Sequence, residues 1–143
     1  MIAAHFAAAM ALLETAADGI PVHDTDASRF VGDPGAYPFF VLSGGTVRSF
    51  SESLGGCEDG AQGLLRVTHT ALAPQAVREL LDISRPALQG ARLAVGGRYG
   101  WDLELEDSQE VEVDRDVRPQ GDENAAFPYF AVDIYRIGSS VLG

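Results

Sequence analysis

The chain has 143 residues, of which 46% are hydrophobic and 22% are charged, proportions typical of a folded globular domain. At this length we expect a single domain, residues 1–143, that buries one core. The formal net charge is −11, from 10 basic and 21 acidic side chains. This charge excludes non-specific binding of nucleic acid, because such binding needs cations that neutralise phosphates.

A first helix is predicted over residues 1–17. Its larger apolar side chains recur every three to four residues, which favours an amphipathic helix. This stripe consists of Ile2, Phe6, Ala9, Leu13 and Ala17. Gly19 follows at a position suited to a left-handed C-terminal cap. The segment has no basic start and Glu14 interrupts it, so we do not expect a signal peptide, and no stretch reaches the roughly 18 apolar residues of a membrane span.

Short strands and loops are predicted for the middle of the chain. Residues 20–24 and 37–42 have strand character, and the Asp, Ser, Gly and Pro residues between them indicate a loop. Residues 43–63, rich in Gly and Ser, predict a flexible arm or hairpin, whose candidate contact residues are Arg48, Phe50 and Leu54. The arm contains Cys57, and a single cysteine excludes an intrachain disulfide. Residues 64–70 return to a strand with His69 on its apolar face.

A second helix and further strands are predicted for the C-terminal half. Pro74 suits a first helical turn, an apolar stripe at helical spacing runs to Leu88, and Gly90 ends the helix. After this helix we expect a short strand over residues 92–95, a hairpin over residues 101–116 and a long strand over residues 127–137. The predicted fold class is α+β: a largely antiparallel β-sheet flanked by two main α-helices, in a single domain.

The predicted hairpin at 101–116 carries the strongest pattern in the chain, since apolar residues there alternate with acidic ones. Period-two alternation places one set on each face of a strand, which predicts one buried face and one carboxylate face. The carboxylates are Asp102, Glu104, Glu106, Glu110, Glu112, Asp114 and Asp116. Two interpretations remain open at this point: a solvated face that aids solubility, and a surface along which a polyanion passes without sticking.

No catalytic, metal or cofactor site is predicted. His23, Asp24 and Asp26, joined by His69, would be the start of a hydrolase site, but no further ligands follow at metal spacing. Ca²⁺ takes six to eight oxygens around one point, whereas alternation spreads carboxylates along a flat face. The glycine pairs form no phosphate loop, which requires a lysine that the chain lacks, and no nucleophile elbow is present. We therefore do not expect an enzyme.

The order of these segments resembles the tail terminator (tail-completion) proteins of long-tailed bacteriophages, in the form found in phages of actinobacteria. The resemblance covers nearly the whole chain and depends on order and spacing, since none of its motifs is catalytic. After the first helix, the segments that carry it are Ile20–Asp24, Tyr37–Leu42, the Gly/Ser-rich arm, Leu65–His69, the helix Pro74–Leu88, Leu93–Arg98, Val113–Val117 and Phe130–Ile137.

This resemblance implies a structural virion protein made in the host cytoplasm. Such proteins form a ring, usually a homohexamer, on the head-proximal end of the tail tube, where it stops polymerisation of the tube protein and offers a docking surface to the head-tail connector proteins. DNA passes through the lumen without specific binding. For this chain the expectation is that the acidic hairpin faces the lumen and that Arg92, Arg98 and Arg115 lie at subunit contacts.

Two alternatives stay open on the sequence alone. The first is a head-side connector or stopper protein of the neck, which forms rings of similar size and needs equally little chemistry. The second is an acidic binding module that mimics DNA and occupies a basic groove on another protein; it would be a stable monomer with carboxylates spaced like phosphates.

Overall fold

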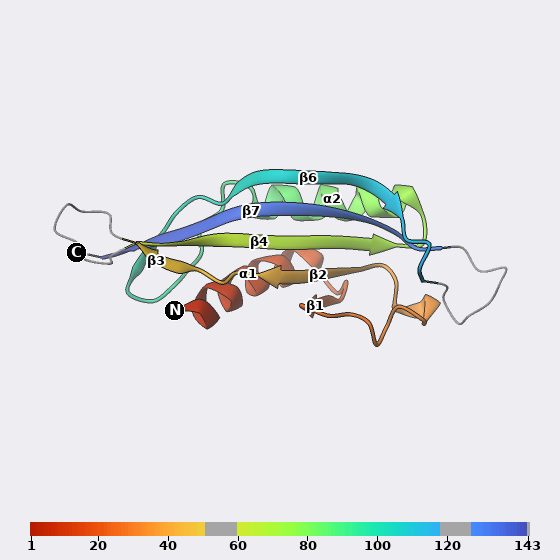
Figure 1. The fold of residues 1–143 in the computed structure, drawn as a ribbon, viewed down its shortest axis with the longest axis horizontal. Helices are drawn as coiled ribbons and strands as arrows, with labels where there is room; N and C mark the ends of the chain where they lie inside the picture. The colour runs from red at the N-terminus through yellow and green to blue at the C-terminus, as the bar shows by residue number, and fades with distance from the viewer. Residues whose placement is uncertain (51–59, 118–126, 143) are drawn as a thin grey trace.

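The computed structural model of the chain describes residues 1–50, 60–117 and 127–142 (Figure 1). Two helices and a mostly antiparallel sheet confirm the predicted α+β class. The elements are α1 (Ile2–Ala17), β1 (Val22–Asp24), the short 3₁₀ helix η1 (Pro34–Ala36), β2 (Phe39–Gly44), β3 (Arg48–Phe50), β4 (Gly60–Ala71), α2 (Pro74–Leu88), β5 (Arg98–Gly100), β6 (Glu104–Val113) and β7 (Tyr129–Val141).

The two longest strands, β4 and β7, form the centre of the sheet. They pair antiparallel from Gly60 opposite Ser140 to Ala71 opposite Tyr129. The other side of β4 pairs with β2 and, further along, with β3, whereas the other side of β7 pairs with β6 and then with β5. Strand β1 completes the sheet, parallel to β2. The sheet is therefore long and narrow, and β6 forms one of its borders (Figure 1).

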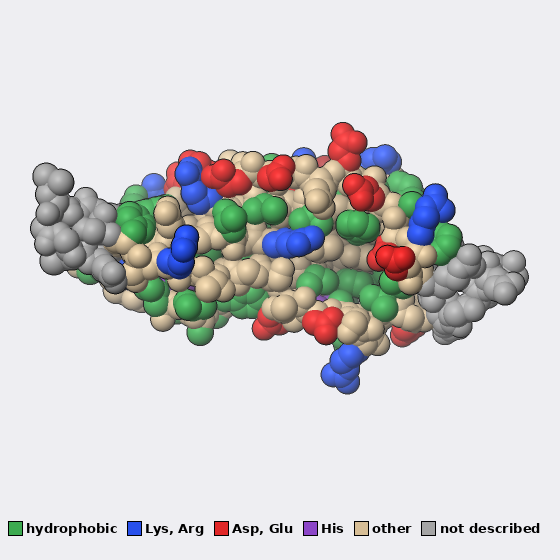
Figure 2. Space-filling model, viewed as in Figure 1, with side chains coloured by type: hydrophobic (Ala, Val, Ile, Leu, Met, Phe, Trp, Pro, Cys, Tyr) green, Lys and Arg blue, Asp and Glu red, His purple; other side chains and the backbone are tan. Residues whose placement is uncertain are grey.

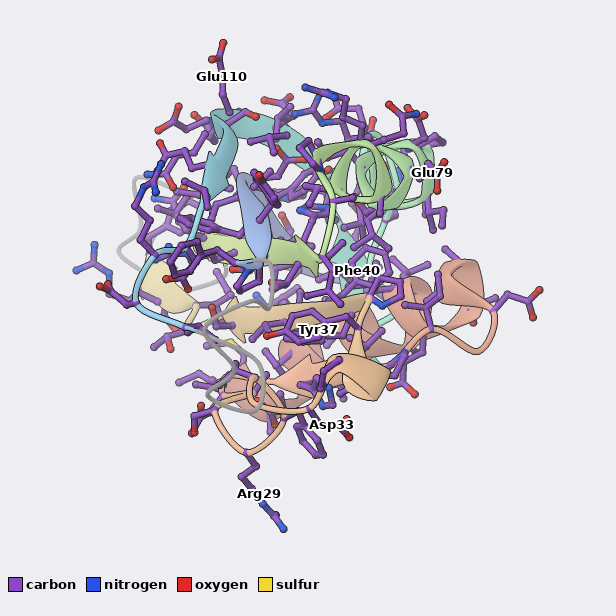
Figure 3. All side chains as sticks on the ribbon, turned by 90° about the vertical axis from the view of Figure 1, so that its right-hand side faces the viewer. Arg29, Asp33, Tyr37, Phe40, Glu79 and Glu110 are labelled. Atoms are coloured by element: carbon purple, nitrogen blue, oxygen red, sulfur yellow. The ribbon has the colours of Figure 1, made fainter. Side chains whose placement is uncertain are left out.

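Both helices lie on the same side of the sheet, so the core is a single layer between helices and strands (Figures 1 and 3). Leu13 of α1, Leu80 of α2 and Phe40, Leu65 and Tyr135 of the sheet are all within 2% of full burial. Alternation along β4 and β7 directs every second side chain into this layer. Among the described residues no helix is both long enough and apolar enough to cross a membrane.

Helix α2 is also attached to the sheet by a buried ion pair. The guanidinium of Arg85 donates from Nε to Oδ2 and from Nη2 to Oδ1 of Asp133, both at 2.9 Å, and the Asp133 side chain is fully buried. Burial, the largest single effect, raises the pKa of Asp133, but the hydrogen bonds from Arg85 and Ser108 and the nearby charges of Arg85 and His69 together outweigh it, and the pKa lies below its usual range. A buried carboxylate needs such a partner, so the pair fixes where α2 sits on β7.

A buried histidine makes a second polar attachment. Nδ1 of His69 lies 3.1 Å from the carbonyl oxygen of Ala131, which only accepts, so Nδ1 carries the proton. Nε2 then accepts from the Ser84 hydroxyl of α2 at 2.6 Å. The predicted position of His69 on the apolar face of its strand is confirmed, since its side chain is fully buried.

The predicted hairpin at 101–116 is wrong, because one strand occupies this stretch. β6 runs through residues 104–113 and pairs with β7 over its length, with register shifts between Leu105 and Asp107 and between Gln109 and Glu112. No glycine, proline or asparagine stands in the middle of the segment to reverse the chain, so the strand continues and absorbs the broken alternation as bulges. The apolar prediction holds for Leu103, which is fully buried.

Three smaller predictions also need correction. Residues 92–95 form no strand: Arg92 makes one isolated bridge to Asp102, and the ladder to β7 begins only at β5. β4 begins at residue 60, earlier than predicted, because its early glycines leave room for the backbone of Thr46 and for the Phe50 ring. On α1 the buried row begins at His5, since Ile2 is 47% exposed.

We expect His69 to make the fold sensitive to mild acid. Its burial lowers the pKa below 6.5, so between that value and the folded-state pKa the unfolded chain binds a proton that the folded chain does not. The free energy of unfolding should therefore fall as the pH drops below 6.5, by at most about 1.4 kcal/mol per pH unit from this one group.

The measurement is urea unfolding between pH 7.5 and 5 for the wild type and for His69→Gln. The variant should lose this part of the pH dependence whatever its absolute stability, because glutamine does not titrate. Equal slopes for the two proteins would contradict the assignment.

Candidate functional site

The sheet has one face that no described element covers completely, and we call it the open face. Leu65, Val67 and His69 of β4 point toward the helices, so the residues between them point the other way. Residues paired across neighbouring strands lie on the same side of the sheet, so the pairs of β4 with β2 and with β7 show which residues of those strands also point away from the helices. The open face includes Val41, Leu64, Arg66, Thr68, Thr70, Phe130, Val132, Ile134 and Arg136.

One border of this face is acidic. The outer side of β6 pairs with no other strand among the described residues, and carboxylates follow it along its whole length. Figure 2 shows acidic side chains gathered along this border, and in Figure 3 Glu110 points away from the sheet. We call this the acidic edge, which consists of Glu104, Glu106, Asp107, Glu110 and Glu112.

The carboxylates of the acidic edge differ in their surroundings. Arg136 lies between Glu104 and Glu106, with Nε 3.2 Å from Oε1 of Glu106. Glu110 and Glu112, by contrast, have no cationic partner within the described part of the chain. Because all these groups are exposed, each ion pair contributes at most about 1 kcal/mol. The negative field at this border therefore comes mainly from the far half of β6.

The seven carboxylates predicted to share a face do not all lie together. Asp102 precedes β6 and accepts from Nε of Arg92 at 2.7 Å. Asp114 and Asp116 follow β6, where the backbone N–H of Asp116 donates to the Asp114 side chain at 3.1 Å. Four of the predicted seven thus belong to the acidic edge, and the β6 bulges are the reason that strict alternation does not describe it.

The three predicted contact arginines all interact within their own chain. Arg92 stacks on the Tyr99 ring, with Cζ 5.0 Å from its centroid, as well as pairing with Asp102. Arg98 donates to the Ser139 hydroxyl at 2.7 Å. Arg115 lies over the Phe127 ring at 5.9 Å. Their role between subunits stays a prediction.

The predicted arm begins as an ordered strand. Arg48 and Phe50 belong to β3, which pairs with the start of β4, and Leu54 lies outside the described residues. The Phe50 ring meets the Trp101 ring edge to face at 5.7 Å, and Trp101 lies over Gly138 of β7. The indole N–H of Trp101 donates to the Ser140 hydroxyl at 2.8 Å. Phe50 is thus an anchor for the base of the arm, whereas Arg48 is exposed.

A groove in the open face was not predicted from the sequence. It has a volume of ≈ 370 Å³ and lies over β2, β4 and β7, beside the loop that follows β1. Its apolar lining includes Tyr37, Val41, Phe130 and Val132, and Arg66 stands in the same groove. The available signal was β7 itself, which is apolar on both of its sides, a pattern typical of a strand with both faces covered.

The hydrolase candidates are not brought together. His69 points to the helices, whereas His23 lies on the open face, stacked on Phe30 at 4.5 Å. The Asp26 side chain accepts from its own loop, at Ser28. Within the described residues no three His, Cys, Asp or Glu side chains are grouped so that they could hold a metal ion.

Comparison with known proteins gives a structural match. No family model matches the chain, and the search of curated proteins finds no match. Among solved structures, the fold is similar to that of a chain in the virion of a native gene transfer agent (GTA) particle, with a TM-score of 0.64 and 14% sequence identity. The similarity covers 96% of this chain and 96% of that chain, so the two share the fold over almost their whole lengths.

We expect Gly138→Ala to disturb the base of the arm. A Cβ at this position would overlap the Trp101 ring and lie 2.9 Å from the carbonyl oxygen of Ala61, so the ring must move. The cost should be about 1–3 kcal/mol of unfolding free energy. Trp101 is the only tryptophan, so its fluorescence should shift to longer wavelength as the ring leaves its contact.

Gly96→Ala is the matched control, because nothing lies within 4 Å of its added Cβ. If both variants keep the wild-type emission and stability, Trp101 is not held in the place described.

Proposed function

We propose that this chain is a structural protein of a virion, and specifically a tail terminator. The observation that carries the proposal is the shared fold with a chain of the GTA virion over 96% of both chains. The order of motifs that resembles the tail terminators of long-tailed phages supports the finer assignment. An open sheet face that carries an apolar groove fits a protein that assembles through its surface.

In this proposal, copies of the chain form a ring, a homohexamer, at the head-proximal end of the tail tube. The ring stops addition of tube protein and presents a surface to the head-tail connector proteins. Closure into a ring requires two different surfaces on each subunit that fit one another. Arg92, Arg98 and Arg115 remain proposed at these contacts, together with β3 and the arm that follows it.

The acidic edge is proposed to line the lumen. Carboxylates without cationic partners repel the phosphates of a passing DNA, which prevents it from binding the wall. Glu110 and Glu112 fit this role best, because Arg136 already offsets Glu104 and Glu106. If exposed arginines lined the lumen instead, their ion pairs with the phosphates would slow the passage of DNA.

The assignment is tested by electron microscopy of particles from a virus that carries a null allele of this gene. Tails of uncontrolled length beside filled, unattached heads are the expected result, because nothing would stop tube growth or join head to tail. Tails of normal length lying unattached would favour a neck protein on the head side. Normal virions would show that the chain is not a virion component of this kind.

The lumen position is tested by Glu110→Gln combined with Glu112→Gln. Loss of two repelling charges per subunit should slow DNA ejection from intact virions by about two- to tenfold while assembly continues. The matched control is Glu14→Gln with Glu79→Gln, which makes the same change in net charge on the exposed surfaces of α1 and α2. Equal ejection rates for both double variants would contradict the proposed position of the acidic edge in the lumen.

A further inference from the structure

The groove in the open face has the chemistry of a protein contact. Its wall combines the aromatic rings of Tyr37 and Phe130 with the aliphatic side chains of Val41 and Val132. Aromatic residues and arginine are enriched at the centres of protein interfaces, where charged residues are otherwise few. Figure 2 shows hydrophobic side chains scattered among polar ones over the middle of the molecule.

Arg66 places a positive charge in the groove. Its side chain is exposed on β4, between Ser43 of β2 and Ile134 of β7 in the ladder. Neither cross-strand neighbour is acidic, and Arg66 has no ion-pair partner among the described residues. The fixed fork of a guanidinium suits bidentate binding of a carboxylate. Beside Arg66, an occupant of this groove should therefore bring an apolar surface together with a carboxylate, whereas Asp26 and Asp114 of the same groove repel any further negative charge.

We infer that the occupant is a second copy of this chain. The inference rests on the proposed function, in which each subunit must offer two different surfaces to its neighbours. With 21 acidic against 10 basic side chains, another copy meets Arg66 with an excess of carboxylates. A nucleic acid fits poorly, because the groove also holds Asp26 and Asp114 and the face is bordered by the acidic edge.

The contact leaves the acidic edge free. Arg66 belongs to β4, and β7 separates β4 from β6, so a neighbour seated over β2, β4 and β7 need not cover the outer side of β6. One face of the sheet then serves assembly and its border serves the lumen.

The test is self-association of the full chain, measured by sedimentation and light scattering over a range of concentrations. Arg66→Glu should raise the dissociation constant between copies by about thirtyfold or more, because it places a carboxylate against a carboxylate. Arg66→Lys should weaken association less, since it keeps the charge and loses the fork. Arg78→Glu on α2 is the matched control and should associate like the wild type, because Arg78 is exposed, has no ion pair among the described residues and lies away from the groove.

Circular dichroism and Trp101 fluorescence confirm that each variant is folded. A wild-type chain that stays monomeric at its highest soluble concentration overturns the inference. An Arg66→Glu variant that associates as tightly as the wild type also overturns it. Neither result bears on tail termination, which fails only if the null virus makes normal tails; normal capping by Arg66→Glu would reject the contact and leave the proposed function standing.

Discussion

The antiparallel pairing of β4 with β7 is the constraint on which the rest of the structure depends. Twelve consecutive residue pairs fix the register, and with it which side chains face the helices and which face outward. A slip by one residue would exchange the two sets along a whole strand. The buried attachments prevent such a slip: Asp133 must meet Arg85, and His69 must meet Ser84, and both partners come from α2. The buried contacts of β4 and β7 with α2 thus determine which residues form the open face and its groove.

The polar attachments also explain why both helices lie on one side of the sheet. Arg85, Ser84 and His5 all come from helices and all pair with groups on the inner side of β4 or β7. His5 accepts from the Ser139 hydroxyl at 2.7 Å, and Ser139 accepts from Arg98 in turn. No equivalent attachment spans the middle of the open face among the described residues, where β7 presents the half-buried Phe130 and Ile134, whereas Val132 between them is only 2% exposed. Apolar side chains placed outward on a central strand are better suited to a partner than to water.

Local patterns predicted the local elements, and contacts between distant residues decided the remainder. Helix α2 was predicted at its observed bounds because Pro74, the apolar stripe and Gly90 all lie within it or beside it. The burial of His5 was not predictable, since its partner Ser139 is 134 residues away. The hairpin was predicted in place of β6 because bulges depend on the strand opposite. The groove around Arg66 needs the joint register of three strands, which no single stretch of sequence contains.

The acidic edge constrains how copies can meet. An unpaired border strand of ten residues offers free N–H and C=O groups to any other strand, and natural proteins block such pairing with charges and bulges. β6 has both, with two register shifts and five carboxylates, so pairing of two β6 edges would bring like charges directly together. In the proposed ring, contact between copies would therefore use the faces of the sheet or its other border. The repulsion that disfavours pairing with a second β6 also acts on a phosphate backbone, so the same carboxylates would serve both needs of the proposed ring: an edge that stays unpaired and a wall that DNA does not bind.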